Sequence, residues 1–357
     1  MDKPNNFIKG RGAQEKVPNR FEGLRHESLP EYREYQTREG EETSLRTQYL
    51  KVYPKSIVNK VESPDVGMSY SMNPYQGCEH GCVYCYARNS HEYWGYGPGL
   101  DFESRILVKE NAPALLEQLL RKSSWRATPI VLSGNTDCYQ PAESRFRLTR
   151  ACLQVFLKYR HPVGIITKNT RILRDLDLLE ALNRHGLVGV HISVTTLEKE
   201  TRRLLEPRTA TTGQRLKTIQ TLSEAGIPVN AMLAPIIPGI NSHELMGLAR
   251  AVADAGARSF GLNVVRLNGA TGEIFTQWIR RAMPSRAEKV LNQIKACHGG
   301  TLNDSRFGIR NKGEGPVAQQ IHRMAAICRK RYFRGQVFPE LNTELHQDYK
   351  TGQMRLF

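Results

Sequence analysis

The sequence predicts an α/β fold built around a parallel β-sheet. From residue 66 onwards, short apolar runs alternate with longer stretches whose apolar residues recur at helical spacing. Parallel strands need crossover connections, so this alternation indicates a parallel sheet with right-handed crossovers. About six strand–helix units can be counted, fewer than the eight of a closed barrel. In this chain of 357 residues, the pattern alone allows either a partial barrel or an open doubly wound sheet.

The predicted elements follow one another in a regular order. Strands are expected over residues 69–74, 129–132, 163–167, 188–194, 228–234 and 259–265. Helices are expected over residues 114–121, 148–159, 172–179, 216–222 and 317–331. A further helix is expected after Asn241, because Asn241 with Glu244 three residues later is typical of a capping pair.

Small and polar residues follow several of the predicted strands. They occupy residues 133–137, 167–169, 193–196 and 234–241. In parallel α/β folds, ligands lie at the carboxyl ends of the strands. We therefore expect a nucleoside-like ligand at this edge of the sheet.

Three cysteines lie close together in a glycine-containing loop after the first predicted strand. Cys78, Cys82 and Cys85 have Cys-x3-Cys-x2-Cys spacing. Three thiolates on one tight loop can hold three irons of a cubane cluster and leave the fourth iron open for chemistry. The alternative is a structural zinc site with His80 or another cysteine as fourth ligand. Such sites usually need a second Cys or His pair further along, and the sequence has none, so an iron–sulfur cluster is favoured.

The charge and cysteine content indicate a partner class and a compartment. Lys and Arg total 51 against 35 Asp and Glu, a net charge of +16 that favours a polyanion, nucleic acid before an anionic surface. A merely basic enzyme is the alternative. The first residues lack the apolar core of a signal peptide. The longest mainly apolar run, 231–240, contains two prolines and is too short to span a bilayer, so no membrane association is expected. An odd number of cysteines indicates a reducing cytoplasm.

Four motifs carry a resemblance to a known family. They are Asn-Pro-Tyr-Gln-Gly-Cys-Glu-His-Gly-Cys (73–82), Thr-Asp-Cys-Tyr-Gln-Pro (136–141), Ile-Ser-Val-Thr-Thr-Leu (192–197) and Ser-Arg-Phe-Gly (305–308). The chain resembles the radical SAM superfamily over roughly residues 8–330. Within it, the chain is most similar to the spore photoproduct lyase-like group, often labelled DNA repair photolyase, and there to a bacterial family whose reaction is uncharacterised. The cysteine motif is specific for the superfamily, whereas the others say little about the substrate.

The resemblance implies a fold, two cofactors and a reaction. The fold is a partial (β/α)6 TIM-like barrel with an irregular N-terminal arm and a basic C-terminal extension. The cofactors are a 4Fe-4S cluster on Cys78, Cys82 and Cys85, and S-adenosylmethionine on the open iron. An electron from a donor such as flavodoxin or ferredoxin would cleave the sulfonium to give a 5′-deoxyadenosyl radical, which abstracts hydrogen from the substrate.

The resemblance also implies roles for single residues. Thr136 matches a residue that contacts the methionine part of the cofactor. Lys168 matches a residue that pairs with the cofactor carboxylate, a role that suits a lysine ammonium. Ser193 matches a residue near the ribose and carboxylate, and Ala234 a backbone position beside the adenine. Further expected cofactor contacts are Asp137, Tyr84 and the weaker candidates Arg208 and Arg215. A strand-end cap or a solvated helix face is the alternative for these polar residues.

One position departs from the lyase pattern. The lyase has a hydrogen-donating cysteine two residues before the position of Thr136, and here that residue is Gly134. This argues against actual photoproduct lyase activity. Cys138 is a speculative replacement donor, with a buried packing cysteine as the default. The other three cysteines, Cys152, Cys297 and Cys328, lie at core spacing and are expected to pack.

Four regions are expected along the chain. They are a charged irregular arm (1–60), the core (61–300), a basic loop–helix extension (301–336) and a flexible tail (337–357). Residues 329–334 mix cations with aromatics, which suits phosphate contact plus base stacking or simply a solvated helix end. The tail resembles peptides that dock on the bacterial sliding clamp, with Gln353 making polar contacts and Leu356 and Phe357 filling an apolar pocket.

The sequence thus indicates a cytoplasmic radical SAM enzyme acting on a nucleic-acid component, with damaged or modified DNA favoured. Radical modification of RNA, a protein or a metabolite is a second interpretation. A zinc-stabilised nucleic-acid-binding adaptor recruited by the clamp is a third, and the cofactor-like strand ends argue against it.

Overall fold

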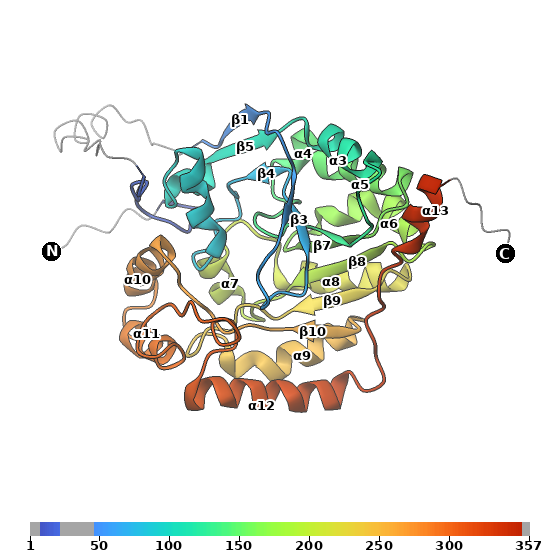
Figure 1. Cartoon of the computed structure of the whole chain (residues 1–357). Helices are drawn as coiled ribbons and strands as arrows, with labels where there is room; N and C mark the ends of the chain where they lie inside the picture. Colours follow the sequence, from blue (N-terminus) through green and yellow to red (C-terminus); the bar gives the residue numbers. More distant parts are fainter. Residues whose placement is uncertain (1–7, 22–45, 352–357) are drawn as a thin grey trace.

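A seven-stranded sheet forms the centre of the structure, a computed structural model that describes residues 8–21 and 46–351 (Figure 1). Its strands are β2 (Val58–Lys60), β3 (Tyr70–Met72), β6 (Ile130–Leu132), β7 (Val163–Thr167), β8 (Val188–Ser193), β9 (Val229–Met232) and β10 (Ser259–Gly261). Their order is β10-β9-β8-β7-β6-β3-β2, with β3 and β6 to β10 parallel and β2 antiparallel to β3. The described sheet is open, with six parallel strands, as predicted for a partial barrel.

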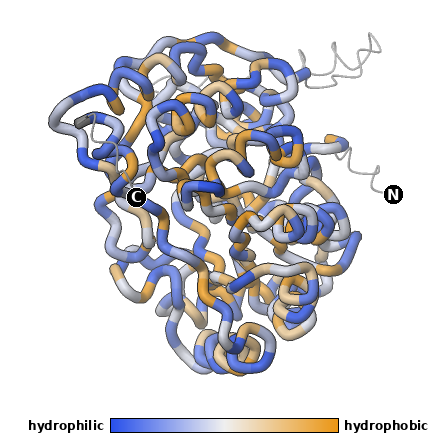
Figure 2. The backbone as a smooth tube through the Cα atoms, turned by 90° about the vertical axis from the view of Figure 1, so that its right-hand side faces the viewer, coloured by the Kyte–Doolittle hydropathy of each residue, from blue (hydrophilic) through white to orange (hydrophobic). Residues whose placement is uncertain are grey.

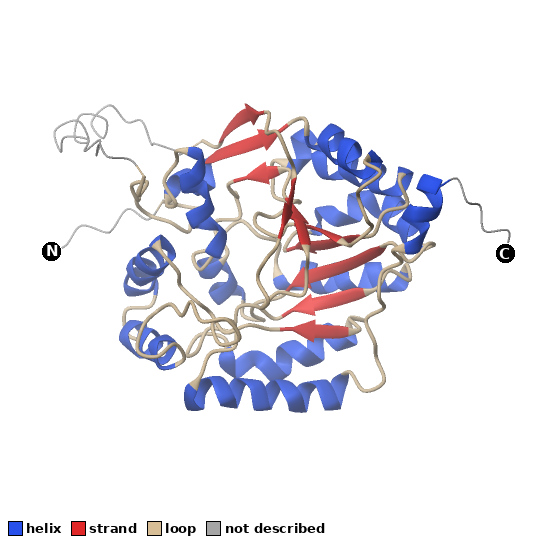
Figure 3. Cartoon of the chain, viewed as in Figure 1, coloured by secondary structure: helices blue, strands red, loops and turns tan. Residues whose placement is uncertain are grey.

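Helices connect the parallel strands and cover the outside of the sheet (Figure 3). The connecting helices are α3 (Ala112–Arg121), α4 (Glu143–Phe146), α5 (Leu148–Lys158), η2 (Thr170–Asp175), α6 (Leu176–Asn183), α7 (Lys199–Leu205), α8 (Thr212–Glu224), η3 (Ser242–Glu244) and α9 (Leu245–Asp254). The arrows of β9 and β10 point towards α7, α10 (Ala270–Ala282) and α11 (Ala287–Ala296), on the left of Figure 1. The carboxyl ends of all six parallel strands therefore meet at this side of the molecule.

The core lies between the sheet and these helices. In the centre of the sheet, Val163 pairs with Val188 and Ile165 with Val190, and all four side chains are fully buried. Burial on both faces explains why these strands are continuous apolar runs in the sequence. In Figure 2 the longer apolar stretches run through the middle of the molecule, and hydrophilic stretches lie mainly around its edge.

Part of the predicted irregular arm is regular structure, so that prediction was wrong for two segments. Besides β2 in the main sheet, β1 (Gln48–Val52) pairs parallel with β5 (Arg105–Lys109), which pairs antiparallel with β4 (Tyr75–Gln76). This small sheet holds the chain that follows β3, together with η1 (Tyr86–Trp94) and α2 (Leu100–Ser104). The partner strand lies more than fifty residues away, so local sequence carries no signal for the pairing.

The basic extension bridges the two edges of the open sheet. The carbonyl of Asn311 accepts a hydrogen bond from Val264, just after β10. The carboxylate of Asp65, between β2 and β3, accepts hydrogen bonds from the Gly308 amide (2.6 Å) and from the Arg310 guanidinium (2.5 Å). Residues 308–311 therefore tie the β10 edge to the β2–β3 edge.

The C-terminal elements fold back against the sheet and its helices. Helix α12 (Gly315–Tyr332) packs on α9, and Phe333 is buried against Phe260, whose ring also lies 4.7 Å from the Arg329 guanidinium carbon. These two side chains of the 329–334 segment are thus engaged by the protein, which disfavours the base-stacking interpretation. Helix α13 (Glu344–Thr351) is held by His346, which is fully buried and hydrogen bonded to the Tyr159 carbonyl.

The described part of the predicted flexible tail is therefore docked on the protein. The peptide residues Gln353, Leu356 and Phe357 lie outside the described residues. Of the helices within the described ranges, none is long and apolar enough to cross a membrane.

The predicted helix start at Asn241 is confirmed, but the capping pair is not: Asn241 is the N-cap residue of η3, which leads into α9, and its side chain makes no capping hydrogen bond. The Asn241 side chain accepts from the Ile237 amide and donates to the carbonyls of Thr195 and Pro235, and helix α9 begins at Leu245. The Glu244 carboxylate accepts instead from Thr196 and Leu197. Tertiary partners at the ends of β8 and β9 thus replace the local cap.

We expect Asp65→Asn to lower the urea midpoint of unfolding, because it removes the charge that pairs with Arg310 and weakens the bridge across the sheet edges. Asp254→Asn is the matched control, since the ion pair of Asp254 with Arg250 is on the surface, with both side chains about 70% exposed. Equal midpoints for the two variants in urea unfolding would contradict the bridging role.

Candidate functional site

The three cysteines lie in a tight loop at the carboxyl end of β3. Cys78 and Cys82 are each 7% exposed and Cys85 is half-buried. The Cys78 amide donates to the Phe102 carbonyl (2.8 Å) and the Val83 amide to the Leu205 carbonyl (3.1 Å). Two glycines with positive φ, Gly77 and Gly81, turn the chain where it packs too closely for a side chain: a Cβ on Gly81 would lie 2.8 Å from the Glu103 carboxylate.

A buried ion pair fixes the outer side of this loop. Arg88 donates to the Cys82 carbonyl (2.9 Å) and to the Glu103 carboxylate (2.6 Å), and both charged side chains are fully buried. The same carboxylate accepts from the Gly12 and Ala13 amides at 3.0 and 2.7 Å. The described N-terminal segment 8–21 is therefore part of the site, where the sequence predicted an irregular arm.

The cysteine loop suits a cluster better than a single zinc ion. Tetrahedral zinc places its sulfur ligands about 3.8 Å apart, given Zn–S bonds of about 2.3 Å. In the described structure the sulfurs of Cys78, Cys82 and Cys85 do not all lie within 4.8 Å of one another. Burial raises the pKa of the Cys78 and Cys82 thiols, so bound metal would have to supply the stabilisation of the thiolates.

His80 does not offer a free nitrogen as the fourth zinc ligand. It is fully buried, with Nδ1 3.3 Å from the Asp137 carboxylate and Nε2 3.2 Å from the Asn169 amide nitrogen. The contact of Nδ1 is a charge contact without hydrogen-bond geometry, whereas Nε2 accepts from the Asn169 amide group. Both nitrogens thus lie against protein groups at the strand ends.

Thr136 and Asp137 lie in the loop that follows β6. The Thr136 hydroxyl donates to the Tyr75 carbonyl (2.6 Å), which leaves its oxygen free to accept a bond from a ligand. The Asp137 carboxylate accepts from the Thr167 hydroxyl and the Lys168 amide, both at 2.8 Å. Burial favours the neutral acid, but His80 and these hydrogen bonds lower the pKa of Asp137 to about 2. All these Asp137 contacts are with the protein, so its carboxylate positions Lys168.

The ammonium of Lys168 has no partner in the part of the chain that the structure describes. Among the described residues it makes no hydrogen bond and no ion pair, although its side chain is half-buried. Burial lowers its pKa, but Cys82, Glu206 and Asp137 outweigh this, and the pKa lies above its usual value. A charged group left unpaired at the strand ends is suited to bind an anionic ligand such as a carboxylate.

Ser193 and Ala234 lie at the ends of the next strands. Ser193 is the last residue of β8 and is 3% exposed, and Ala234 is half-buried just after β9. Because these strands are parallel neighbours, the structure brings Thr136, Lys168, Ser193 and Ala234 to one edge of the sheet, beside the cysteine loop.

Glu206 joins this edge to the cysteine loop, and sequence analysis gave it no role. Its carboxylate accepts hydrogen bonds from the Tyr84 hydroxyl, the Thr195 hydroxyl (2.5 Å) and the Arg215 guanidinium (2.5 Å), and it is fully buried. Burial alone would raise the pKa of Glu206, but Arg215 and Lys168 lower it to about 2. The hydroxyl of Tyr84, an expected cofactor contact, is thus bonded to a protein carboxylate, next to Cys85 in the chain.

The two arginine candidates differ from each other. The Arg215 guanidinium is fully buried, and besides Glu206 it donates to the carbonyls of Ser193 and Ala210, so we do not propose it as a cofactor contact. Arg208 is half-buried beside Gly10 of the N-terminal segment, and among the described residues its guanidinium makes no hydrogen bond and no ion pair. Arg208 therefore stays a candidate partner of the cofactor carboxylate.

The structure explains the glycine at position 134 and the place of Cys138. A Cβ at Gly134 would lie 2.5 Å from the Ser71 Cβ, so this loop packs on β3 without room for a side chain. Cys138 is 1% exposed in the main core, which favours the packing role over hydrogen donation. Cys152, Cys297 and Cys328 are fully buried in the same core, as predicted.

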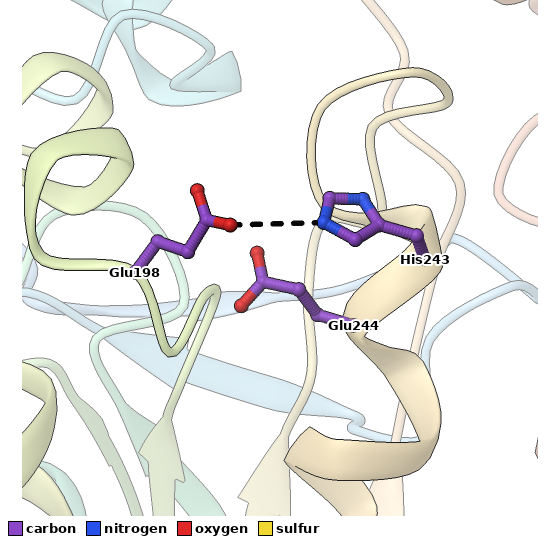
Figure 4. A group of neighbouring side chains, drawn as sticks. All are labelled: Glu198, His243 and Glu244. Carbon is purple, nitrogen blue, oxygen red and sulfur yellow. Dashed lines mark ion pairs between the residues drawn. The ribbon is translucent and has the colours of Figure 1, made fainter.

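A second group of candidate metal ligands lies at the ends of β8 and β9. Glu198, His243 and Glu244 have ligand atoms within 4.8 Å of one another (Figure 4). Glu198 and His243 are about 60% exposed and 3.8 Å apart, an ordinary surface ion pair. The Glu244 oxygens are bonded to Thr196 and Leu197 (2.6 Å each), which accounts for its position without a metal.

Sequence analysis missed the residues that connect the loops. Asn73 accepts from the Thr136 amide, and Gln140 bonds to Glu79 and Gly77 of the cysteine loop. Both lie inside the motifs quoted above, which was the available signal. Glu103 and Glu206 had no signal, because their partners lie 15 and 9 residues away with no periodic pattern.

Comparisons with known proteins agree with this site. The model of the Radical SAM superfamily matches residues 72–252. An uncharacterized protein of Mycobacterium tuberculosis is 36% identical over 242 residues, which cover 66% of this chain and 70% of the relative. A protein of Pseudomonas phage M6 named radical SAM Nalpha-GlyT isomerase is 26% identical over 173 residues, 48% of this chain and 34% of that protein.

A solved structure has a similar fold. A spore photoproduct lyase mutant with bound AdoMet and dinucleoside spore photoproduct superimposes with a TM-score of 0.61, covering 89% of this chain and 86% of that one. The sequence identity is 15%, so the likeness concerns the fold.

We expect Glu206→Gln to destabilise the protein by about 3–5 kcal/mol, because it leaves the buried Arg215 without its carboxylate. The effect should shrink in acid. The unfolded chain protonates Glu206 near its usual pKa of 4.5, whereas the folded protein holds it ionised down to about 2. Stability from this pair is therefore full above about pH 4.5 and is lost as pH falls towards 2.

Urea unfolding from pH 7 to pH 3 measures this difference. Glu288→Gln is the matched control, since its pair with Arg280 is about 60% exposed and should change stability by less than about 1 kcal/mol. A Glu206→Gln cost that is no larger, or that does not fall with pH, would contradict the buried pair.

We expect Gly134→Cys, which places a thiol where the lyase has its donor, to destabilise the protein by about 1–3 kcal/mol through overpacking on Ser71. Gly213→Cys should not destabilise the protein, because open space surrounds Gly213. Adding Ser71→Gly to the Gly134→Cys protein should recover most of the lost stability. Thermal unfolding of these three variants and the original protein tests this, and a Gly134→Cys protein as stable as Gly213→Cys would show that the contact is easily relieved.

Proposed function

Because this chain belongs to the radical SAM superfamily, we propose that it is a radical SAM enzyme acting on a nucleic-acid component, a DNA lesion or a modified base. The observation that carries the enzymatic part is the Lys168 ammonium, which has no partner among the described residues and lies at the same sheet edge as the three-cysteine loop. A binding adaptor has no use for a half-buried unpaired cation at such a position, and the hydrogen bond of His80 Nε2 with Asn169 weakens the zinc alternative.

The residues present fit both cofactors of this chemistry. Cys78, Cys82 and Cys85 would hold a 4Fe-4S cluster, and Lys168 would pair with the carboxylate of S-adenosylmethionine. Thr136, Ser193 and Ala234 line the same edge. When bound, these cofactors supply a carbon-centred radical that abstracts hydrogen from a substrate.

The chain's own residues would prepare this site. Asp137 holds the Lys168 backbone, and Glu206 fixes Tyr84 beside the last cysteine. The buried pair of Arg88 and Glu103 fixes the loop from the other side. The electrostatic partner of the cofactor carboxylate is thus in position before binding, which lowers the ordering cost.

The proposal of a nucleic-acid substrate rests on the net charge of the chain and on its similarity in fold to the solved lyase. The net charge of +16 favours a polyanion, and the solved lyase of similar fold contains a dinucleoside ligand. Radical modification of RNA, a protein or a metabolite is the alternative.

We further propose that the protein works in a reducing cytoplasm, in line with its seven free cysteines. Flavodoxin or ferredoxin would be the electron donor. Gln353, Leu356 and Phe357 would dock on the sliding clamp.

The test is anaerobic reconstitution with iron and sulfide, reduction with dithionite, and assay for 5′-deoxyadenosine with and without DNA. We expect production that rises with DNA and falls to background in Cys82→Ala. Cys328→Ala, a packing cysteine, should retain it.

The outcomes separate the proposals. Production that is indifferent to DNA would keep the enzyme and reject the DNA substrate. Absence of 5′-deoxyadenosine from a protein with a loaded, reducible cluster would reject catalysis. A colourless zinc protein after anaerobic purification would favour the adaptor.

A further inference from the structure

A cavity of about 380 Å³ adjoins the cysteine loop on the side of the small sheet. Its lining includes Ser71, Asn73, Gln76, Trp94, Lys109 and Asn135. These residues come from β3, β4, β5, η1 and the loop after β6. The cavity therefore lies where the two sheets meet, at the carboxyl edge of β3 and β6.

Lys109 is a buried cation that has no counter-charge within residues 8–21 and 46–351. Its side chain is 8% exposed, and among the described residues its ammonium makes no hydrogen bond and no ion pair. The neighbouring carboxylate of Glu110 is engaged elsewhere, by Lys51 (2.8 Å) and the Tyr53 hydroxyl (2.7 Å). Burial lowers the pKa of Lys109 to about 8. A buried charge costs free energy unless it is paired, so this position fits a ligand that brings an anion.

An aromatic ring lies next to this cation. Trp94 is 36% exposed, and the Lys109 ammonium lies 5.7 Å from its ring centroid. This is a cation–π distance, which partly offsets the burial of the charge. The exposed part of the ring is suited to stack on a planar group such as a nucleobase.

Amide side chains line the same cavity and form a fixed hydrogen-bond network. The Asn135 Nδ2 group donates to the Ser90 hydroxyl (2.8 Å) and to Gln76 (3.3 Å), and Asn73 Oδ1 accepts from the Asn135 amide (2.9 Å). Within the described residues, Asn135 Oδ1 and Asn73 Nδ2 make no hydrogen bond. One acceptor and one donor, held rigidly, are thus left for a ligand, and amide side chains of this kind pair with base edges.

The cavity is adjacent to the cofactor residues. Gln76 lies two residues before Cys78, and Asn135 is followed by Thr136, whose amide donates to the same Asn73 oxygen (3.1 Å). A group bound in the cavity is therefore a neighbour of the atoms where radical chemistry would begin.

We propose that this cavity binds one nucleotide unit of the substrate, with its phosphate on Lys109, its base against Trp94 and the base edge on Asn135 and Asn73. The proposal rests on the proposed nucleic-acid function and makes it more specific. Lys55, exposed at the rim, adds a second cation, which fits a phosphate better than a singly charged carboxylate.

The test is isothermal titration of the full-length protein with the four deoxynucleoside monophosphates and the corresponding deoxynucleosides at 150 mM salt. A monophosphate should bind at least tenfold tighter than its nucleoside. Lys109→Met should weaken monophosphate binding about 10- to 150-fold, the range for a charge-assisted hydrogen bond, and leave nucleoside binding unchanged. Trp94→Leu should weaken both ligands.

Lys217→Met is the matched control, because it removes the same charge from an exposed position on α8. Thermal unfolding shows whether Lys109→Met folds. We expect a midpoint no lower than that of the original protein, since methionine fills the space without a buried charge. Lys109→Gln removes the same charge and serves as a second variant in the binding test.

Three results would overturn the nucleotide cavity. The first is equal binding of monophosphates and nucleosides. The second is an equal loss of monophosphate binding in Lys109→Met and Lys217→Met. The third is Lys109-dependent binding of N-acetylglycine that is tighter than that of any monophosphate, which would assign the cavity to a carboxylate.

Single-stranded oligodeoxynucleotides distinguish the two levels of the proposal. If Lys109→Met binds them as tightly as the original protein does, the nucleic-acid function stands and the cavity assignment falls. If the original protein binds neither oligonucleotides nor monophosphates, while it makes 5′-deoxyadenosine, the nucleic-acid function fails and the cavity assignment falls with it.

Discussion

The buried carboxylate of Glu206 is the interaction on which the site depends. It receives hydrogen bonds from Tyr84 in the cysteine loop, from Thr195 after β8 and from Arg215 on α8. Three segments far apart in the chain therefore meet at one charge. Because an isolated buried carboxylate is costly, each partner is needed to keep the others in place. The distance between the cysteine loop and the strand ends is set by this group.

Glu103 acts in the same way on the other side of the loop. Its pair with Arg88 is fully buried, and its carboxylate also receives two amides of the N-terminal segment. Buried ion pairs contribute little net stability compared with apolar packing, but breaking one is expensive. In this protein such pairs specify the path of a glycine-containing loop whose thiols have to be placed together. The loop is thus held by the protein itself, before any metal contributes.

Cations that are paired with protein groups have a structural role here, and unpaired cations are suited to bind ligands. The arginines at the site, Arg88 and Arg215, are buried and fully hydrogen bonded to protein groups. Two lysines, Lys168 and Lys109, have ammonium groups without partners among the described residues. Lys168 lies at the strand ends, and Lys109 lines the cavity beside β3. This arrangement provides one anion site for a cofactor and another for a substrate.

The sequence by itself determined the α/β class, the six parallel strands and the cysteine loop, because apolar period and cysteine spacing are local signals. It also placed Thr136, Lys168, Ser193 and Ala234 at one edge, since parallel strands align their carboxyl ends. It could not supply Glu206, Glu103 or the cavity around Lys109. It also missed the strand β1 and the docking of the described tail, and it expected a capping hydrogen bond that the Asn241 side chain does not make. In each case the deciding partner is distant in the chain. Only tertiary packing brings together a buried charge and its counter-charge, or places a cation in the wall of a cavity.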